Sequence, residues 1–501
     1  MPTAYWAGGA SGAETDTNNA ANWVDAANGT NAFGSVPDGN DDVIIQSTSN
    51  SNVSHNPTQT AAHTFNSIHI ESGGHWTADG SNHLTLNGEN GSHFAFGNDG
   101  TFTHTNGTVV INNGGGGISH AAIRNGIATS TTGFYDLTIS GGGTTCEIYG
   151  DTTIHRNMEA GGSTTVLRGA LTVTGNLTVG GTLNTRFSST DRNLTVTGWC
   201  DVNGTLTLND SVVSINALRA NSGAAITQGS SGTLELAAGG GSNFAGSGNT
   251  EGSSYSLRNV DGTSDINLGG TTTISGGSYF EPRTAPDYAS VLNNLVWNTG
   301  AYWVGNLTIG GTLIVNASKH LQPYGGSKDI VVTGDVTLNG KLSAYPNGHS
   351  DLDNMTFKSL TINNGGEYAA TTGTTTITGE SGSGVNLSNS GTFTHNQGTV
   401  KVTCATQTSL VGFNGTNGFY NYTYAGTGSG QDQVCGGNTD FFGQVIIDSA
   451  NSEVQMQSHT FNLYGGITIK QGGWDIGSSD TSGTVNVYGS VRNVGGTVVA
   501  S

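Results

Sequence analysis

The feature that most constrains the fold of this chain is a short repeated unit in which a threonine stands between two aliphatic residues. Glycine or Asn-Gly follows closely, and examples of the unit are Leu171-Thr172-Val173, Leu177-Thr178-Val179, Leu194-Thr195-Val196 and Leu206-Thr207-Leu208. Strict alternation of apolar and polar residues is typical of a half-buried β-strand, and the glycines mark turns between strands. The connections leave no room for crossover helices, so the sequence predicts an all-β fold.

Longer segments of the chain also recur. The matching pairs are 176–183 with 306–313 (seven of eight residues identical), 99–111 with 390–402 (eight of thirteen), 64–74 with 356–366 (six of eleven), and GFYDLTI at 133–139 with GFYNYTY at 418–424. The last three pairs keep their order at similar offsets, so a block at 64–139 returns in part at 356–424. Such self-similarity is typical of repeat architectures.

Two all-β architectures fit short strands with glycine turns: a parallel β-helix, or β-solenoid, and a string of β-sandwiches. Sandwich domains usually show aromatic and proline residues at each boundary, whereas aromatic residues are 8% here and scattered. We therefore favour the β-helix and keep the sandwich string as the alternative. At about 20 residues per coil, roughly 20–25 coils are expected.

The predicted organisation has four parts. Residues 1–45 form an N-terminal cap or attachment segment, 46–277 the first solenoid half, 278–304 an aromatic and proline-containing loop or joint, and 305–501 the second half. The first part contains two tryptophans, Trp6 and Trp23, before the first clear strand. A cap is physically reasonable because the end of a β-helix exposes an unpaired strand edge.

Charge and targeting signals exclude several classes of function. The net charge of −20 disfavours nucleic-acid binding, because phosphate backbones are repelled. No apolar run reaches the roughly 18–20 residues of a membrane span, so membrane insertion is not expected. The opening MPTAYWAGGASG has neither the basic nor the apolar segment of a signal peptide, which predicts synthesis in the cytoplasm.

The spacing of the cysteines and histidines bears on metal and disulfide sites. The four cysteines, Cys146, Cys200, Cys404 and Cys435, lie far apart and are predicted to be buried small hydrophobic residues. His63, His83 and His104 follow one another at close to the expected coil length, as do His55 and His75. One residue per coil would stack these histidines in columns, either as a solvated stack or as metal ligands. With no metal-binding, nucleotide-binding or catalytic-triad motif, we predict no metal, no cofactor and no catalytic residue.

The best candidate for ligand binding is the break in periodicity at 278–303. Its candidate residues are Tyr279, Phe280, Glu281, Arg283, Asp287, Tyr288, Trp297, Tyr302 and Trp303. Aromatic faces beside carboxylates suit a sugar ring, and the alternative is a loop that packs on itself. A second aromatic stretch, predicted as core or as an interface with a neighbouring subunit, comprises Phe413, Phe419, Tyr420, Tyr422, Tyr424, Phe441 and Phe442. Alternation predicts that its three tyrosines share one strand face.

The repeats LTVTGNLTVGGTL at 171–183 and VTGDVTLNGKL at 332–342 resemble those of tail-fibre and other structural proteins of marine and cyanobacterial phages. The resemblance covers most of 64–500, but β-solenoid adhesins use similar repeats. It implies a non-enzymatic virion structural protein, a tail fibre or capsid decoration, located in the virion after synthesis in the host cytoplasm. It also implies other virion proteins as partners, a homotrimer, and a surface that binds host glycans. Two alternatives stay open: a polysaccharide-degrading tailspike, which needs paired carboxylates near 278–303, and an extracellular adhesin.

Overall fold

The structure is a computed structural model of the chain. It describes residues 2–89, 94–112, 120–125, 133–141, 145–162, 164–237, 255–260, 264–282, 291–325, 328–344, 354–381, 384–405, 408–428, 433–475 and 483–499.

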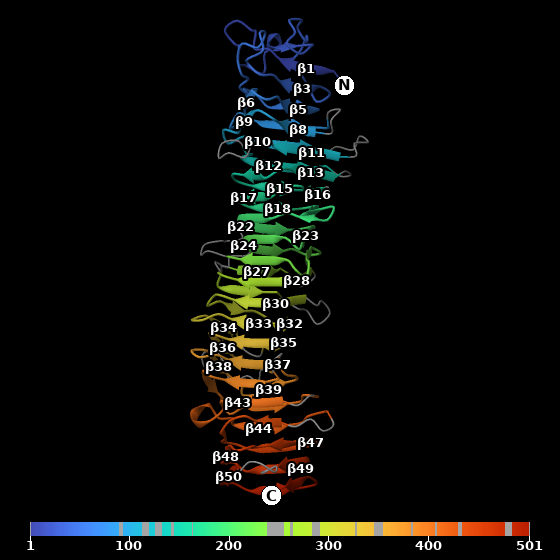
Figure 1. Cartoon of the computed structure of the whole chain (residues 1–501). Coiled ribbons are helices and arrows are strands. Elements are labelled where there is room, and N and C mark those ends of the chain that lie inside the picture. Colours follow the sequence, from blue (N-terminus) through green and yellow to red (C-terminus); the bar gives the residue numbers. More distant parts are fainter. Residues whose placement is uncertain are drawn as a thin grey trace. The chain divides into compact units, whose positions relative to one another are not determined.

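The chain folds as a parallel β-solenoid with about 16 turns, in which about 55% of the residues are in strands and about 1% in helices. It divides into two compact units. Unit 1 consists of 1–235, 244–246 and 259–267, and unit 2 consists of 236–243, 247–258 and 268–501. Within each unit every coil contributes short strands that pair in parallel with those of the coils before and after it (Figure 1). The predicted parallel β-helix is thus confirmed, in preference to the string of sandwiches.

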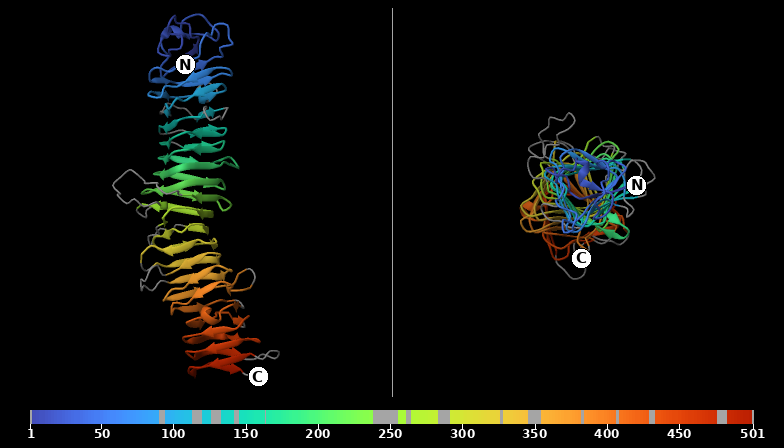
Figure 2. Two further views of the ribbon diagram at one scale, coloured as in Figure 1. Left: turned by 90° about the vertical axis from the view of Figure 1, so that its left-hand side faces the viewer. Right: turned by 90° about the horizontal axis from the view of Figure 1, so that it is seen from above.

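Each unit has three faces, which the chain visits in the order face 1, face 2, face 3; Figure 2 shows the strands of each unit stacked coil on coil. In unit 1, face 1 consists of β1 (Thr3–Trp6), β3 (Asp42–Ile45), β5 (Ser67–Ile70), β8 (Phe94–Asn98), β11 (His120–Asn125), β13 (Thr145–Tyr149), β16 (Thr164–Leu167), β19 (Thr182–Asn184), β23 (Thr205–Asn209) and β25 (Ala225–Gln228). Face 2 consists of β6 (His75–Thr77), β9 (Thr101–Thr103), β14 (Thr152–Ile154), β17 (Leu171–Val173) and the first parts of β22 (Leu194–Val202) and β24 (Val212–Ala220). Face 3 consists of β4 (His63–Phe65), β7 (His83–Leu86), β10 (Thr108–Asn112), β12 (Asp136–Ser140), β15 (Met158–Ala160), β18 (Leu177–Val179) and the second parts of β22 and β24. The stretch where the chain passes between units holds β26 (Thr233–Leu236), β27 (Tyr255–Asn259) and β28 (Asp265–Ile274).

Unit 2 repeats this plan. Face 2 consists of β29 (Tyr279–Glu281), β31 (Tyr302–Trp303), β34 (His320–Pro323), β36 (Lys341–Ser343), β38 (Glu367–Ala369), β41 (Thr392–Thr394), the helical turn η2 (Gly415–Asn417), β46 (Thr439–Phe441), β48 (Thr460–Leu463) and β50 (Thr484–Val487). Face 3 consists of β32 (Leu307–Ile309), β39 (Thr374–Ile377), β42 (Thr399–Val402), β44 (Asn421–Tyr424), β51 (Val491–Asn493) and the first parts of β30 (Val291–Trp297), β35 (Ile330–Leu338), β37 (Met355–Ile362), β47 (Val445–Gln455) and β49 (Ile467–Asp475). Face 1 consists of β33 (Leu313–Val315), β40 (Leu387–Asn389), β43 (Thr408–Val411), β45 (Gln433–Cys435), β52 (Thr497–Val499) and the second parts of those long strands.

The core lies inside the coils and follows directly from the sequence alternation. In β17, Leu171 and Val173 are buried while Thr172 is half-buried on the outside. Burial of each such aliphatic side chain is worth about 1.5–3 kcal/mol. The four cysteines are also buried and free, as predicted. Burial raises the pKa of the Cys146 thiol to about 12 and that of Cys404 to about 11.

Coil length varies more than the sequence suggests. Cys200 pairs with Leu177 of the preceding coil and with Leu218 of the following coil, and the first interval along the chain is the longer one. The interval between the paired residues Leu360 and Leu387 is longer still. The prediction of 20–25 coils was therefore too high, because turns of unequal length add residues without adding a coil.

The same variation overturns the histidine columns. β4 pairs with β7 so that His63 lies opposite Leu84 and not opposite His83. A slip of one residue reverses which side of the sheet a side chain faces, so His63 is buried and His83 is exposed. His104 is in the turn after β9.

The N-terminal segment adds an antiparallel strand pair at the start of the parallel stack. β1 pairs in parallel with β3 on one side and antiparallel with β2 (Trp23–Val24) on the other, and the helical turn η1 (Ala20–Asn22) leads into β2. The Trp6 and Trp23 rings meet edge to face with centroids 4.9 Å apart, and both are fully buried. The Asn22 side chain accepts a hydrogen bond from the Ala10 N–H (2.7 Å) and donates to the Ala13 carbonyl (2.8 Å).

The two copies of the repeated block fold alike. In the first copy Trp76 pairs with Phe102 between β6 and β9, and in the second Tyr368 pairs with Phe393 between β38 and β41. The Gly-Phe-Tyr motifs also match, because Phe134 and Phe419 each form an isolated parallel bridge to the next coil of face 2.

We expect acidification to destabilise the fold as the pH falls below about 6.5. Burial lowers the pKa of His63, His75, His104, His320 and His395 from the ordinary value of 6.5. Below pH 6.5 the unfolded chain therefore binds protons that the folded chain does not, and the free energy of unfolding falls. Urea denaturation at pH 7.5, 6.5 and 5.5 measures this slope.

The matched pair His63→Asn and His83→Asn tests the origin of the slope. His63 is buried and its Nε2 lies 2.8 Å from Thr17 Oγ1, whereas His83 is exposed. The first substitution should reduce the pH slope and the second should leave it unchanged. Equal slopes in both variants and the parent protein would contradict the assignment.

Candidate functional site

The predicted ligand-binding residues divide between the core and the surface. Phe280, Trp297 and Trp303 are fully buried and belong to the core. Glu281 is 2% exposed, and its Oε2 lies 3.6 Å from Arg258 Nε.

The remaining predicted residues are at the surface or undescribed. Tyr279 and Tyr302 are half-buried on the outside of face 2. Arg283, Asp287 and Tyr288 lie outside the described residues. The described part of the predicted loop or joint forms regular strands, β29, β30 and β31, within unit 2.

Tyr279 and Tyr302 form a cluster with a third ring that the sequence interpretation missed. Tyr279 and Tyr302 stack with centroids 6.0 Å apart. Tyr324, which is 52% exposed, meets both edge to face at 4.8 and 6.0 Å. Two predicted residues are thus brought together with an exposed phenol from the next coil.

A longer aromatic row lies further along unit 2, at the corner where the chain turns from face 2 to face 3. We define the corner row as His395, Tyr420, Phe442, Tyr464 and Tyr488, one residue from each successive coil. The Phe442 and Tyr464 rings are stacked at 5.4 Å, and those of Tyr464 and Tyr488 at 5.0 Å, with planes within 12° of parallel. Tyr464 and Tyr488 are 44% and 66% exposed. These centroid distances fit offset stacking, in which each ring leaves part of its face open.

A row of polar side chains runs beside the exposed end of the corner row. Asn462 donates a hydrogen bond to Asp440 Oδ1 (2.6 Å), and Asn486 donates to Asn462 Oδ1 (2.8 Å). Asn462 stands two residues before Tyr464, and in a strand such residues face the same side. Aromatic rings beside amide and carboxylate oxygens are the combination that carbohydrate sites use.

The second predicted aromatic stretch supplies both the core and the corner row. Phe413, Phe419, Phe441, Tyr422 and Tyr424 are buried. Tyr420 departs from the prediction that the three tyrosines share one face, because it precedes β44 and sits at the corner, half-buried. Its ring lies 5.3 Å from that of His395.

The sequence carried a signal for the corner row that our interpretation overlooked. Three exposed rings and the half-buried Phe442 are each followed directly by glycine, in Tyr324-Gly325, Phe442-Gly443, Tyr464-Gly465 and Tyr488-Gly489. The last three pairs follow one another at intervals of one coil. A side chain on Gly465 would overlap the preceding coil, since its Cβ would lie 2.3 Å from the Gly443 carbonyl oxygen.

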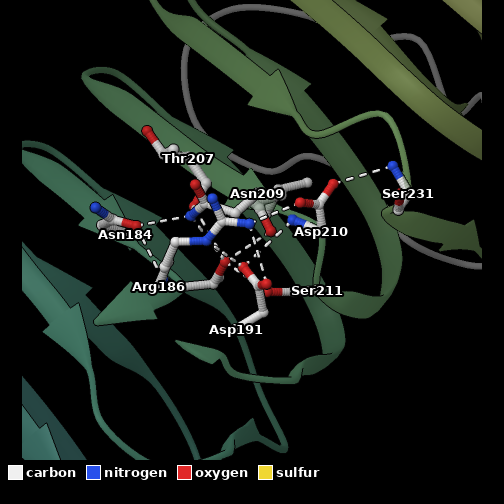
Figure 3. A network of polar contacts seen from close by, with 10 residues as sticks. Asn184, Arg186, Asp191, Thr207, Asn209, Asp210, Ser211 and Ser231 are labelled. Carbon is white, nitrogen blue, oxygen red and sulfur yellow. Dashed lines mark hydrogen bonds and ion pairs between the residues drawn. The ribbon is translucent and has the colours of Figure 1, made fainter. Parts of the chain in front are cut away.

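Unit 1 carries a polar network around Arg186 (Figure 3). Arg186 of the hairpin β20 (Arg186–Phe187) and β21 (Thr190–Asp191) donates to both carboxylate oxygens of Asp191, at 2.7 and 3.0 Å. The same guanidinium donates to Asp210 Oδ2 at 2.7 Å, and Asp210 also accepts from the Ser231 N–H at 3.0 Å. The Arg186 bonds lower the pKa of Asp191. One guanidinium thus bridges two neighbouring carboxylates.

Three further properties hold for the described residues. They contain no group of three or more His, Cys, Asp or Glu side chains placed to share a metal ion. Among them, no helix combines the length and hydropathy that a membrane span requires. A small void of about 10 Å³ lies inside unit 2, lined by side chains that include Tyr422, Phe441 and Trp474. It is far too small for a sugar, so the candidate sites are on the surface.

Comparison of the chain with known proteins gave no match, whether to protein-family models, to curated proteins or to solved structures.

Proposed function

We propose that this protein is a non-catalytic structural protein of a virion that displays carbohydrate-binding surfaces on a β-solenoid scaffold. The observation that carries the binding proposal is the end of the corner row, where the half-buried Phe442 and the exposed Tyr464 and Tyr488 lie beside the polar row. The virion proposal is supported by the resemblance of the repeats at 171–183 and 332–342 to those of phage structural proteins. That resemblance also supports a homotrimer and other virion proteins as partners.

The scaffold suits the display of a row of side chains because backbone pairing holds each coil in a fixed position relative to its neighbours. Backbone pairing places successive rings about 4.8 Å apart along the stack, which is comparable to the length of one sugar unit in an extended glycan. Tyr464 and Tyr488 each follow a strand of face 2, β48 and β50, whose residues pair in register. A row on rigid strands loses little entropy on binding.

Carboxylate chemistry favours binding over hydrolysis. A glycosidase needs one carboxyl group that stays protonated near neutral pH. In unit 1, Asp191 and Asp210 share Arg186, and Glu147 is held by Arg168 at 2.8 Å. The Arg186 hydrogen bonds lower the pKa of Asp191, whereas a general acid needs a raised pKa, which supports the non-catalytic proposal over the polysaccharide-degrading tailspike.

The double substitution Tyr464→Ala/Tyr488→Ala is expected to weaken polysaccharide binding by about tenfold for each ring removed. Both side chains are exposed, so the fold should be retained. Affinity electrophoresis through gels that contain neutral polysaccharides, with host cells as a second binding target, measures the effect.

Two controls sharpen this test. Tyr464→Phe/Tyr488→Phe keeps the rings and should keep most of the binding, and Val212→Ala changes an exposed residue of unit 1 and should change nothing. Unaltered binding by the double alanine variant would refute the corner row as the site.

Release of reducing sugar ends would refute the non-catalytic assignment. Absence of the protein from purified virions, measured by mass spectrometry, would refute the virion assignment.

A further inference from the structure

Unit 1 contains the same three-ring corner that begins the corner row of unit 2. In unit 1 the His104 ring lies 5.5 Å from that of Tyr135 and 4.8 Å from that of His155. In unit 2 the His395 ring lies 5.3 Å from that of Tyr420 and 5.6 Å from that of Phe442. The first two rings of each corner come from the two copies of the repeated block, and the third ring belongs to the coil that follows each copy.

Details of the turns match as well. The Asn106 N–H donates to His104 Nδ1 (3.3 Å), and the Gln397 N–H donates to His395 Nδ1 (2.9 Å). A glycine supports the third ring in both corners. A Cβ on Gly133 would lie 3.0 Å from His155 Nε2, and a Cβ on Gly418 would lie 3.0 Å from Phe442 Cε2.

The two corners have the same arrangement of rings but differ in the residues at three equivalent positions. Unit 1 has Asp136, His155 and Arg156 where unit 2 has Asn421, Phe442 and Gly443. Arg156 Nε donates to Asp136 Oδ1 (2.9 Å), and its guanidinium lies over the Tyr135 ring at 4.8 Å. The Arg156 side chain is 54% exposed, whereas Asp136 is 10% exposed.

Packing alone does not explain His155. Its Nε2 is buried without a hydrogen-bond partner among the described residues, and such an atom costs about 1–3 kcal/mol. Phe442 shows that an apolar ring fills the equivalent place in unit 2. The imidazole therefore destabilises this corner relative to an apolar ring, which points to a role outside the fold.

We propose that this corner of unit 1 is a second carbohydrate subsite, selective for a sugar unit that carries an anionic group, either a carboxylate or a sulfate ester. This inference rests on the proposed carbohydrate-binding function and adds a ligand class to it. The Tyr135 ring, against which His104 stacks and over which the Arg156 guanidinium lies, forms an aromatic wall of this subsite. The bond from Asn106 to His104 Nδ1 leaves Nε2 as the protonated, donating nitrogen. The exposed part of the Arg156 fork supplies charge-assisted donors, which suit planar carboxylate and sulfate oxygens.

The probes are two matched pairs of polymers. Polygalacturonate and its fully methyl-esterified form differ only in the carboxylate charge, and dextran sulfate and dextran differ only in the sulfate esters. We expect the full-length protein to bind at least one charged polymer about tenfold more tightly than its neutral partner in about 0.15 M salt, at which the long-range repulsion from the net charge of −20 is largely screened. The polymer that shows the preference identifies the anionic group.

Variants that place the unit 2 residue at the equivalent position of unit 1 test whether this corner causes the preference for the charged polymer. His155→Phe should reduce the charged-to-neutral preference about threefold or more while leaving the thermal midpoint equal or higher, because an unpartnered polar atom is removed. The double change Asp136→Asn/Arg156→Gly removes the ion pair as a unit and should abolish the preference. Tyr464→Ala/Tyr488→Ala should lose neutral-polymer binding and keep the preference.

The outcomes distinguish failure of the subsite from failure of the proposed function. If neutral polymers bind and charged ones bind no better, the anionic subsite is overturned while the proposed function stands. If a preference exists but survives both unit 1 variants, the assignment to this corner is overturned. If no polymer binds in any pair, the proposed function itself fails and the subsite fails with it.

Discussion

Replacement of Trp23 by alanine is expected to lower the free energy of unfolding by about 3–5 kcal/mol, the range for loss of a large buried aromatic side chain. The Trp23 ring is fully buried between Trp6 and Phe65, with centroids at 4.9 and 6.2 Å. Its Nε1 donates to the Thr17 carbonyl at 3.0 Å. Alanine would leave a cavity and an acceptor without its donor at the place where the cap closes the first coils.

The effect should extend beyond the substituted residue. β1 has β2 on one side and β3 on the other, so a loosened cap uncovers an edge of the parallel stack. Exposed strand edges promote association of chains. We therefore expect Trp23→Ala to lower the thermal midpoint and to aggregate earlier on heating, as followed by circular dichroism and light scattering.

Two further variants test this account. Trp23→Phe keeps most of the apolar volume and should recover about half of the lost stability. Tyr5→Ala changes a half-buried side chain on the neighbouring strand β1 and should cost much less. A Trp23→Ala protein as stable as Tyr5→Ala would mean that residues 1–45 do not act as a cap.

The fold could be predicted because the pattern that defines it, alternation of apolar and polar residues, lies within each short segment of the sequence. In every Leu-Thr-Val unit the same alternation that defines a strand also defines which side chains are buried, as at Leu171 and Val173. Coil length is not local, since a turn can lengthen without disturbing the strands on either side. That is why the number of coils and the alignment of His63 with His83 were wrong.

The candidate site was harder to predict because burial and exposure of aromatic rings depend on the position of one residue. Phe280 and Tyr279 are neighbours in β29, yet the first is core and the second is on the surface. The exposed rings at Tyr464 and Tyr488 become significant only when coils are stacked and their spacing is known. The difference between Phe442 and His155 appears only after the two corners are superposed in register.

Gly412→Ala is expected to destabilise unit 2 by about 3–5 kcal/mol, which combines a backbone cost with a collision between coils. Gly412 has a φ of +87°, a conformation that L-residues rarely adopt. A Cβ there would lie 1.9 Å from the Asn389 carbonyl oxygen of the preceding coil. Neither atom can turn away by side-chain rotation, so the coils must separate.

The matched control for this prediction is Gly365→Ala. Gly365 has a similar φ of +81°, and a Cβ there would meet nothing within 4 Å. It should therefore show the backbone cost alone, about 1–2 kcal/mol. Thermal unfolding of both variants, together with hydrogen exchange at β40 and β43, measures the difference.

If the two variants lose equal stability, close approach between coils is not what requires glycine at 412. A larger loss for Gly412→Ala, with faster exchange at these two strands, would show that the spacing between coils sets the glycine content of such a chain.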